Sequence, residues 1–170
     1  MATALYLVPF AGISFLWFMA VLRDRVGQRE DLFFSTIFLG SGVLFVATLF
    51  LSAGVAGGII IAYGVESDRL PGSASFILAR AISYEVMHVY SVRMAAMFMI
   101  LTSTLALRTG LIARWIAFLG LGLALLLLAS NRSLAGVVLV FPLWVLLISL
   151  WILHDHFGRG AVLGPRRSED

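Results

Sequence analysis

Long apolar runs separated by short charged or turn-forming segments dominate this sequence. Each run approaches the length of about 20 residues that crosses a bilayer core of about 30 Å as an α-helix. The runs cover residues 4–22, 33–58, 86–107, 111–129 and 134–153. We therefore predict an all-α transmembrane helix bundle of about five spans, in one domain over residues 1–156 with a mobile cytoplasmic tail over residues 157–170.

The connections between the runs include two exposed loops and one tight turn. Residues 23–31 hold six charged side chains, which are unfavourable in hydrocarbon. Residues 64–75 are polar and include Pro71-Gly72, a turn-forming pair. Residues 131–133 form a connection so short that the last two spans should be an antiparallel hairpin.

The second apolar run is too long for one perpendicular span. Residues 32–63 contain no charged side chain, and as one helix they would extend about 48 Å, beyond a hydrocarbon core of about 30 Å. We expect the span to end at Gly54, Gly57 and Gly58, with the residues that follow projecting from the membrane or lying at its interface. Small residues permit close helix contact, so self-association or contact with other membrane subunits is expected through Gly40, Gly54 and Gly58.

Composition agrees with a lipid environment. Hydrophobic residues make up 61% of the chain and charged residues 12%, whereas about a quarter of residues are charged in soluble domains. The chain has no cysteine, which excludes disulfides, thiolate metal sites and iron–sulfur clusters. All 12 basic residues are arginines, as in proteins from GC-rich bacterial genomes, and apart from Arg93 they lie at the ends of runs or between them rather than in a basic patch. We therefore expect the lipid bilayer, and no nucleic acid, as a partner.

The arginines also orient the bundle, because arginine-rich loops remain in the cytoplasm. On a five-span topology, eight arginines fall on one side of the membrane and three on the other. The larger set is Arg23, Arg25, Arg29, Arg108, Arg114, Arg159, Arg166 and Arg167, and the smaller set is Arg69, Arg80 and Arg132. The N-terminus should be outside and the C-terminus cytoplasmic. The first run is too long for a signal peptide and lacks a cleavage site, so we expect a retained span of a multi-pass inner-membrane protein.

Residues 76–108 carry the candidate chemistry, because they bring ionisable and hydroxyl side chains into an otherwise apolar region. At about 100° per residue, Tyr84, His88, Ser91 and Thr102 form a polar seam along one helix face. Such a seam normally faces other helices, since lipid offers no hydrogen bonds. Three interpretations stay open: helix packing, the lining of a ligand or ion path, and a haem or metal position with His88 as the ligand.

Glu85 and His88 have the spacing of the carboxylate–histidine pair in helix-bundle metal sites. The pair occurs once, with no second Glu or His in another span, so a mononuclear metal would need ligands from a partner or from water. The sequence also has no glycine-rich phosphate loop, no HExxH pair and no Ser/His/Asp set at a common depth. We do not expect an enzyme, and the residues identify no cofactor.

Arg93 lies inside a predicted span, where an arginine indicates a functional role by default. No other span has a carboxylate in its middle, and Glu85 is eight residues away, about 12 Å along a helix. We expect Arg93 to extend to a lipid headgroup, to bond carbonyls of a neighbouring helix, or to bind a substrate or partner anion. The same helical projection places Arg93 on a different face from His88, which predicts two separate sites.

Two segments resemble small multi-pass membrane proteins of unknown function from actinobacteria and related bacteria. They are Arg108-Thr-Gly-Leu-Ile-Ala-Arg-Trp-Ile-Ala-Phe-Leu-Gly-Leu-Gly, and Phe15-Leu-Trp-Phe with Arg23-Asp-Arg-Val-Gly-Gln-Arg-Glu-Asp. The resemblance implies a bacterial inner-membrane protein and brings no catalytic residue. Our first hypothesis is a non-catalytic subunit of a larger membrane complex that helps hold lipid, pigment or a cofactor. The alternatives are a small oligomeric transporter or channel, and a membrane-embedded haem or metal protein that uses His88.

Overall fold

The computed structural model describes residues 2–26, 32–65, 72–110, 112–130 and 136–160. Within these ranges the backbone is helical apart from short turns, and it contains no strand. The helices are α1 (Ala2–Val26), α2 (Leu32–Val65), α3 (Ala74–Glu85), the π-helix η2 (Val86–Ser91), α4 (Val92–Thr109), α5 (Arg114–Ala129) and α6 (Val137–Gly160). The predicted all-α fold is confirmed for these residues.

Four stretches of helix are long and apolar enough to cross a membrane: Leu5–Asp24, Phe34–Val65, Ala74–Thr109 and Val137–His154. α5 is apolar but shorter, at 16 residues. The structure thus has four to five apolar helices able to span a membrane. α6 continues to Gly160, so residues 157–160 are helical where a tail was predicted. Residues 161–170 lie outside the described part of the chain.

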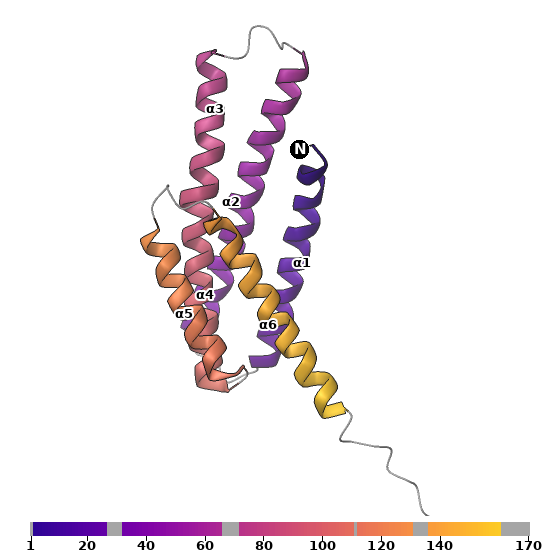
Figure 1. The fold of residues 1–170 in the computed structure, drawn as a ribbon, viewed down its shortest axis with the longest axis vertical. Helices are drawn as coiled ribbons and strands as arrows, with labels where there is room; N and C mark the ends of the chain where they lie inside the picture. The colour runs from indigo at the N-terminus through magenta and orange to yellow at the C-terminus, as the bar shows by residue number, and fades with distance from the viewer. Residues whose placement is uncertain (1, 27–31, 66–71, 111, 131–135, 161–170) are drawn as a thin grey trace, which may run out of the picture.

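α2 runs antiparallel to a continuous rod made of α3, η2 and α4, and the tip of this hairpin extends beyond the other helices (Figure 1). α1 packs against α2. α5 packs along α4, and α6 crosses the bundle obliquely with contacts to both. The chain therefore builds a long central hairpin with shorter helices on its flanks.

α2 does not end at its glycines, so the residues that follow the expected span end at residue 58 continue the same helix. It continues to Val65 as one helix of 34 residues, about 51 Å long. A helical glycine costs only about 1 kcal/mol, and neighbouring α3 supports this part of α2. The Ser52 hydroxyl donates to the Ser83 carbonyl at 2.9 Å, and the Ser83 hydroxyl donates to the Ser52 carbonyl at 3.0 Å.

The rod formed by α3, η2 and α4 has defined ends. Ser73 caps α3, since its hydroxyl oxygen accepts a hydrogen bond from the Phe76 backbone N–H at 3.3 Å. Gly110 ends α4 with a left-handed φ of 68°, and its N–H donates to the Ala106 carbonyl at 2.9 Å. This conformation suits glycine because it has no Cβ. The rod then turns back into α5.

An aromatic cluster joins four helices in the core. Phe15 of α1 lies 5.1 Å from Phe98 of α4 and 5.5 Å from Phe141 of α6, measured between ring centroids. Phe45 of α2 meets Phe141 at 4.7 Å. The ring planes are inclined by 61–66° in these pairs, the edge-to-face geometry that aromatic rings favour. The cluster fixes α6 against helices that are distant in sequence.

α4, α5 and α6 approach one another most closely at Gly120. A Cβ on Gly120 would collide with the Ser103 hydroxyl and would stand 2.6 Å from Nε1 of Trp144. The Ser103 hydroxyl, the Thr102 hydroxyl and the Trp144 indole N–H are buried and have no hydrogen-bond partner among the described residues. Two of these polar groups, on Ser103 and Trp144, thus lie directly beside Gly120.

Arginine and tryptophan side chains gather at one end of the bundle. The Arg108 guanidinium lies 4.5 Å above the ring of Phe34, which joins the end of α4 to the start of α2. Trp115 at the start of α5 meets Trp151 of α6 edge to face at 6.3 Å. Such residues are typical of a membrane–water boundary. The opposite ends of α4 and α5 carry the candidate site.

Candidate functional site

The π-helix η2 orients the side chain of His88. An i→i+5 turn shifts the hydrogen-bond register of the backbone by one residue, and such turns are frequent at functional sites. His88 Nδ1 lies 3.1 Å from the Tyr84 carbonyl oxygen. A carbonyl only accepts, so Nδ1 donates in this contact, and in the neutral imidazole Nε2 is then an acceptor. The Tyr84 ring stacks on the imidazole at 3.9 Å with an interplanar angle of 15°, which further restricts its rotation.

Ser91 attaches the other end of η2 to α2. Its hydroxyl lies 2.9 Å from the Thr48 hydroxyl and 3.1 Å from the Val86 carbonyl, five residues earlier in the chain. Thr48 donates in turn to the Leu44 carbonyl at 2.9 Å. Both ends of the π-turn are therefore held by side-chain hydrogen bonds.

A polar pocket of about 240 Å³ lies beside η2. Its polar residues are Glu85 and His88, Arg93 of α4, and Ser130 at the end of α5, and its apolar residues are Val89, Val92 and Leu127. Arg93 and His88 thus line one pocket, although the helical projection placed them on different faces. The projection assumed an uninterrupted α-helix, and one additional residue in the π-turn changes the register of α4 by about 100°.

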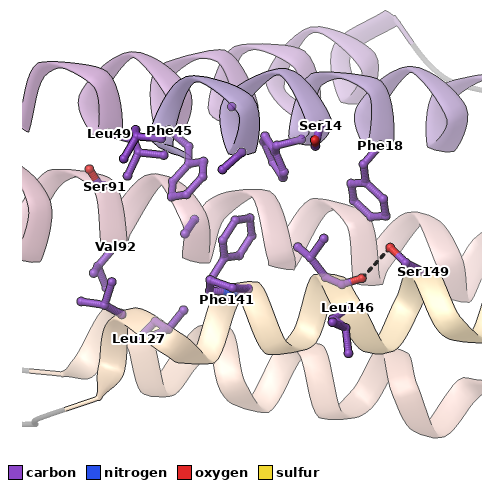
Figure 2. Close-up of a pocket in the computed structure, with 18 of the residues that line it drawn as sticks. Ser14, Phe18, Phe45, Leu49, Ser91, Val92, Leu127, Phe141, Leu146 and Ser149 are labelled. Atoms are coloured by element: carbon purple, nitrogen blue, oxygen red, sulfur yellow. Dashed lines mark hydrogen bonds between the residues drawn. The ribbon is translucent and has the colours of Figure 1, made fainter. Parts of the chain in front are cut away.

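A second, larger cavity of about 700 Å³ lies between α1 and α6. Figure 2 shows Phe18 of α1, Phe45 of α2 and Phe141 of α6 directed into it. We call it the lateral cavity. Its wall is almost wholly apolar, and the Ser149 hydroxyl on α6 donates to the Val145 carbonyl of its own helix at 2.9 Å. Much of the lining on both helices is exposed: Ala11, Ser14, Pro142, Leu146, Leu150 and Leu153. The cavity therefore opens sideways, between α1 and α6.

The lateral cavity and the polar pocket adjoin. Val92 and Leu127 line both of them, and Figure 2 places these two residues with Ser91 at one end of the lateral cavity. The combined site has charged and hydrogen-bonding groups in the polar pocket and apolar walls in the lateral cavity, with Val92 and Leu127 shared between the two. This arrangement matches a molecule with one polar head and one long apolar chain.

The four residues of the predicted polar seam occupy different environments. Tyr84 is exposed above His88, which lines the polar pocket, whereas Ser91 lines the lateral cavity. Thr102 is 1% exposed, in the core. Glu85 and His88 share a pocket, but the described residues contain no group of three or more side chains with metal-ligand chemistry. Gly40, Gly54 and Gly58 leave their Cβ positions open, with nothing within 4 Å.

Several residues of the combined site were not expected from the sequence. Ser130 immediately precedes the polar residues 131–133 in the sequence. These residues were the only sequence signal that could have indicated a role for Ser130. Thr48 and the α1 residues of the lateral cavity give no signal, because they are ordinary residues of apolar runs. The π-turn itself is not predicted by any pattern in the local sequence.

No family model matches this chain, and neither a curated protein nor a solved structure matches it.

Proposed function

We propose that this protein is a non-catalytic subunit of a bacterial inner-membrane complex, and that it holds a lipid chain in the lateral cavity. The proposal includes an outside N-terminus, a cytoplasmic C-terminus and the α5–α6 turn at the outer membrane surface, as the arginine distribution favours. The observation that carries it is the cavity, which is apolar, about 700 Å³ in volume and open toward the side of the bundle. Ligand pockets commonly measure about 300–1,000 Å³.

Shape, rather than hydrophobicity, explains how such a chain would be held. Lipid tails are as apolar as leucine side chains, so a chain gains little transfer free energy when it moves from bilayer to cavity. An unfilled space between Phe18, Phe45 and Phe141 would instead forfeit dispersion contacts on every wall. A chain that follows the channel restores these contacts.

Filling the cavity tests this proposal. Ala11 lines the cavity and is exposed, so Ala11→Phe adds a ring at its mouth without displacing a core residue. Ala20 is exposed on the opposite face of α1, nine residues on, and Ala20→Phe is the matched control. Native mass spectrometry of protein extracted in mild detergent should show several-fold less bound lipid for Ala11→Phe than for the control. Equal occupancy in the two variants contradicts the proposal.

The α2–α3 hairpin supports membership of a larger complex. No residue of α3 is buried, and apolar side chains near the tip are exposed, among them Ile61 at 71% and Leu78 at 61%. With the α5–α6 turn at the membrane surface, the hairpin tip extends beyond it (Figure 1), where an exposed apolar surface is unfavourable. A partner membrane protein packed on α3 would cover this surface, and Gly54 and Gly58 leave room for a close helix.

A photoreactive side chain at Leu78, compared with one at the exposed Leu143 of α6, tests membership of a complex. Illumination of native membranes should yield a protein adduct of defined mass at position 78 and only lipid adducts at position 143. Lipid adducts alone at both positions contradict a subunit role, while leaving the cavity proposal to its own test.

A further inference from the structure

The polar pocket has one side chain that only donates hydrogen bonds and three side chains that can accept them. Arg93 is exposed and brings only N–H donors. The acceptors are the Glu85 carboxylate, Nε2 of His88 and the Ser130 hydroxyl oxygen. Nε2 accepts because Nδ1 donates to the Tyr84 carbonyl. Ser130 accepts because its hydrogen is directed to the Leu127 carbonyl at 2.8 Å.

We propose that this pocket binds the head of a zwitterionic phospholipid with a primary ammonium, a phosphoethanolamine lipid, whose acyl chain occupies the lateral cavity. The phosphate meets Arg93, and the ammonium meets the acceptors on the other side of the pocket. This inference rests on the proposed lipid-holding function and names the class of lipid.

Arg93 suits the phosphate. A guanidinium presents a planar fork of donors that matches two phosphate oxygens, and such charge-assisted bonds are about twice as strong as neutral ones. The position also fits, because Ser130 and the α5–α6 turn lie at the proposed membrane surface, where lipid phosphates are found. A glycerol head offers neutral hydroxyls in place of the ammonium, so its hydrogen bonds to Glu85 lack the positive charge that strengthens those of a primary ammonium.

Glu85, His88 and Ser130 suit the ammonium. A primary ammonium has three N–H donors, and the pocket offers three acceptor side chains. Glu85 also takes part in an interaction within the protein; a carboxylate has about four acceptor positions, so it can bind an ammonium as well. A quaternary ammonium has no N–H to donate and would leave these acceptors unused.

The shared wall of the pocket and the cavity places the proposed sites of the head and the chain next to each other. Val92 and Leu127 form part of both walls, so a head beside Arg93 places the first carbons of a chain against apolar side chains. Hydrocarbon chains of different lipids are alike, and the cavity cannot distinguish them. Selection therefore depends on the polar pocket.

The test uses the full chain in nanodiscs that contain equal amounts of phosphatidylethanolamine, phosphatidylglycerol, phosphatidylcholine and diacylglycerol with identical acyl chains. Native mass spectrometry of the released protein measures which lipids are retained. We expect about tenfold enrichment of phosphatidylethanolamine over the other two phospholipids, which corresponds to about 1.4 kcal/mol.

Two variants test the phosphate contact and the ammonium contact separately, and a third is their control. Arg93→Gln should lower the enrichment of all three phospholipids over diacylglycerol about tenfold. Glu85→Gln should remove the preference for phosphatidylethanolamine over phosphatidylcholine and keep the preference for phospholipids over diacylglycerol. Arg80 is exposed on α3 and lines a different pocket, so Arg80→Gln is the matched control and should change neither ratio.

The outcomes distinguish this inference from the function on which it rests. If wild-type protein retains no lipid, the lipid-holding function is wrong. If it retains lipid with no headgroup preference, or prefers phosphatidylglycerol, the headgroup inference is wrong and the cavity proposal stands. Should a variant fail to fold, competition on wild-type protein by short-chain phosphatidylethanolamine against short-chain phosphatidylcholine decides the same point, and equal competition overturns it.

Discussion

Gly120→Ala should destabilise the bundle, because the added Cβ has no space. It would collide with the Ser103 hydroxyl and stand 2.6 and 2.9 Å from Nε1 and Cε2 of Trp144. Trp144 is 2% exposed, so its rigid indole cannot turn away, and α5 must move from α4. Overpacking of this kind costs about 1–3 kcal/mol, whereas replacing a helical glycine by alanine gains about 1 kcal/mol. We expect a net loss of about 1 kcal/mol.

Gly122 is the matched control. It lies two residues further along the same helix and on another face of it. A Cβ at this position has nothing within 4 Å. Gly122→Ala should therefore keep the helical gain and stabilise the protein by up to about 1 kcal/mol. Unfolding in mixed micelles, followed by circular dichroism during titration with a denaturing detergent, should separate the two variants by about 1–3 kcal/mol. This difference isolates the steric cost.

A second substitution checks the cause of that cost. Ser103→Ala removes the closest of the colliding atoms, and in combination with Gly120→Ala it should recover part of the loss. The expected coupling free energy is at least about 0.5 kcal/mol, the lower end for residues in direct contact. Equal stability of Gly120→Ala and Gly122→Ala, or strict additivity with Ser103→Ala, would refute the close packing of α4, α5 and α6 described here.

Three further predictions address other contacts. Replacing Ser52 or Ser83 by alanine removes one of the two hydroxyl-to-carbonyl bonds, so each variant should lose about 0.6 kcal/mol, the average for hydrogen bonds between membrane helices, and the double variant about the sum; no loss for either variant in the same detergent titration would contradict the reciprocal bonds. Thr102→Val should be neutral or stabilise by up to about 1 kcal/mol, because the buried hydroxyl has no partner among the described residues; a clear loss of stability would show that it has one. Deleting the exposed Tyr90 should remove the additional residue of the π-turn and leave His88 and Arg93 four residues apart, on one face of a regular α-helix, so that lipid retained in the nanodisc assay keeps its headgroup selectivity; lost selectivity would show that the pocket needs the π-turn itself and not only the register that it sets.

Hydropathy was sufficient to predict the helices, because apolar runs of span length have one stable conformation in lipid. It was insufficient to place their ends. Gly54, Gly57 and Gly58 indicated a boundary, yet α2 continues to Val65. The support comes from Ser83, 31 residues along the chain from Ser52. Such a contact between distant residues cannot be deduced from a local composition.

The candidate site was predicted only in part. Glu85, His88 and Arg93 were identified because charged groups are rare in apolar spans, but they were assigned to two sites on the assumption of constant helical periodicity. A single π-turn joins them into one pocket. The lateral cavity was not predicted, because it depends on the angle between α1 and α6, which apolar sequences do not encode in any motif.

The sideways opening of the lateral cavity has a consequence for how its occupancy is controlled. A lipid held between α1 and α6 exchanges with the surrounding leaflet and never needs to cross water. Its occupancy therefore follows the mole fraction of that lipid in a two-dimensional pool, and the aqueous concentration of any solute is irrelevant to it. A cell that changes its ratio of phospholipid headgroups would change the loading of this protein directly, with no diffusible messenger between the two.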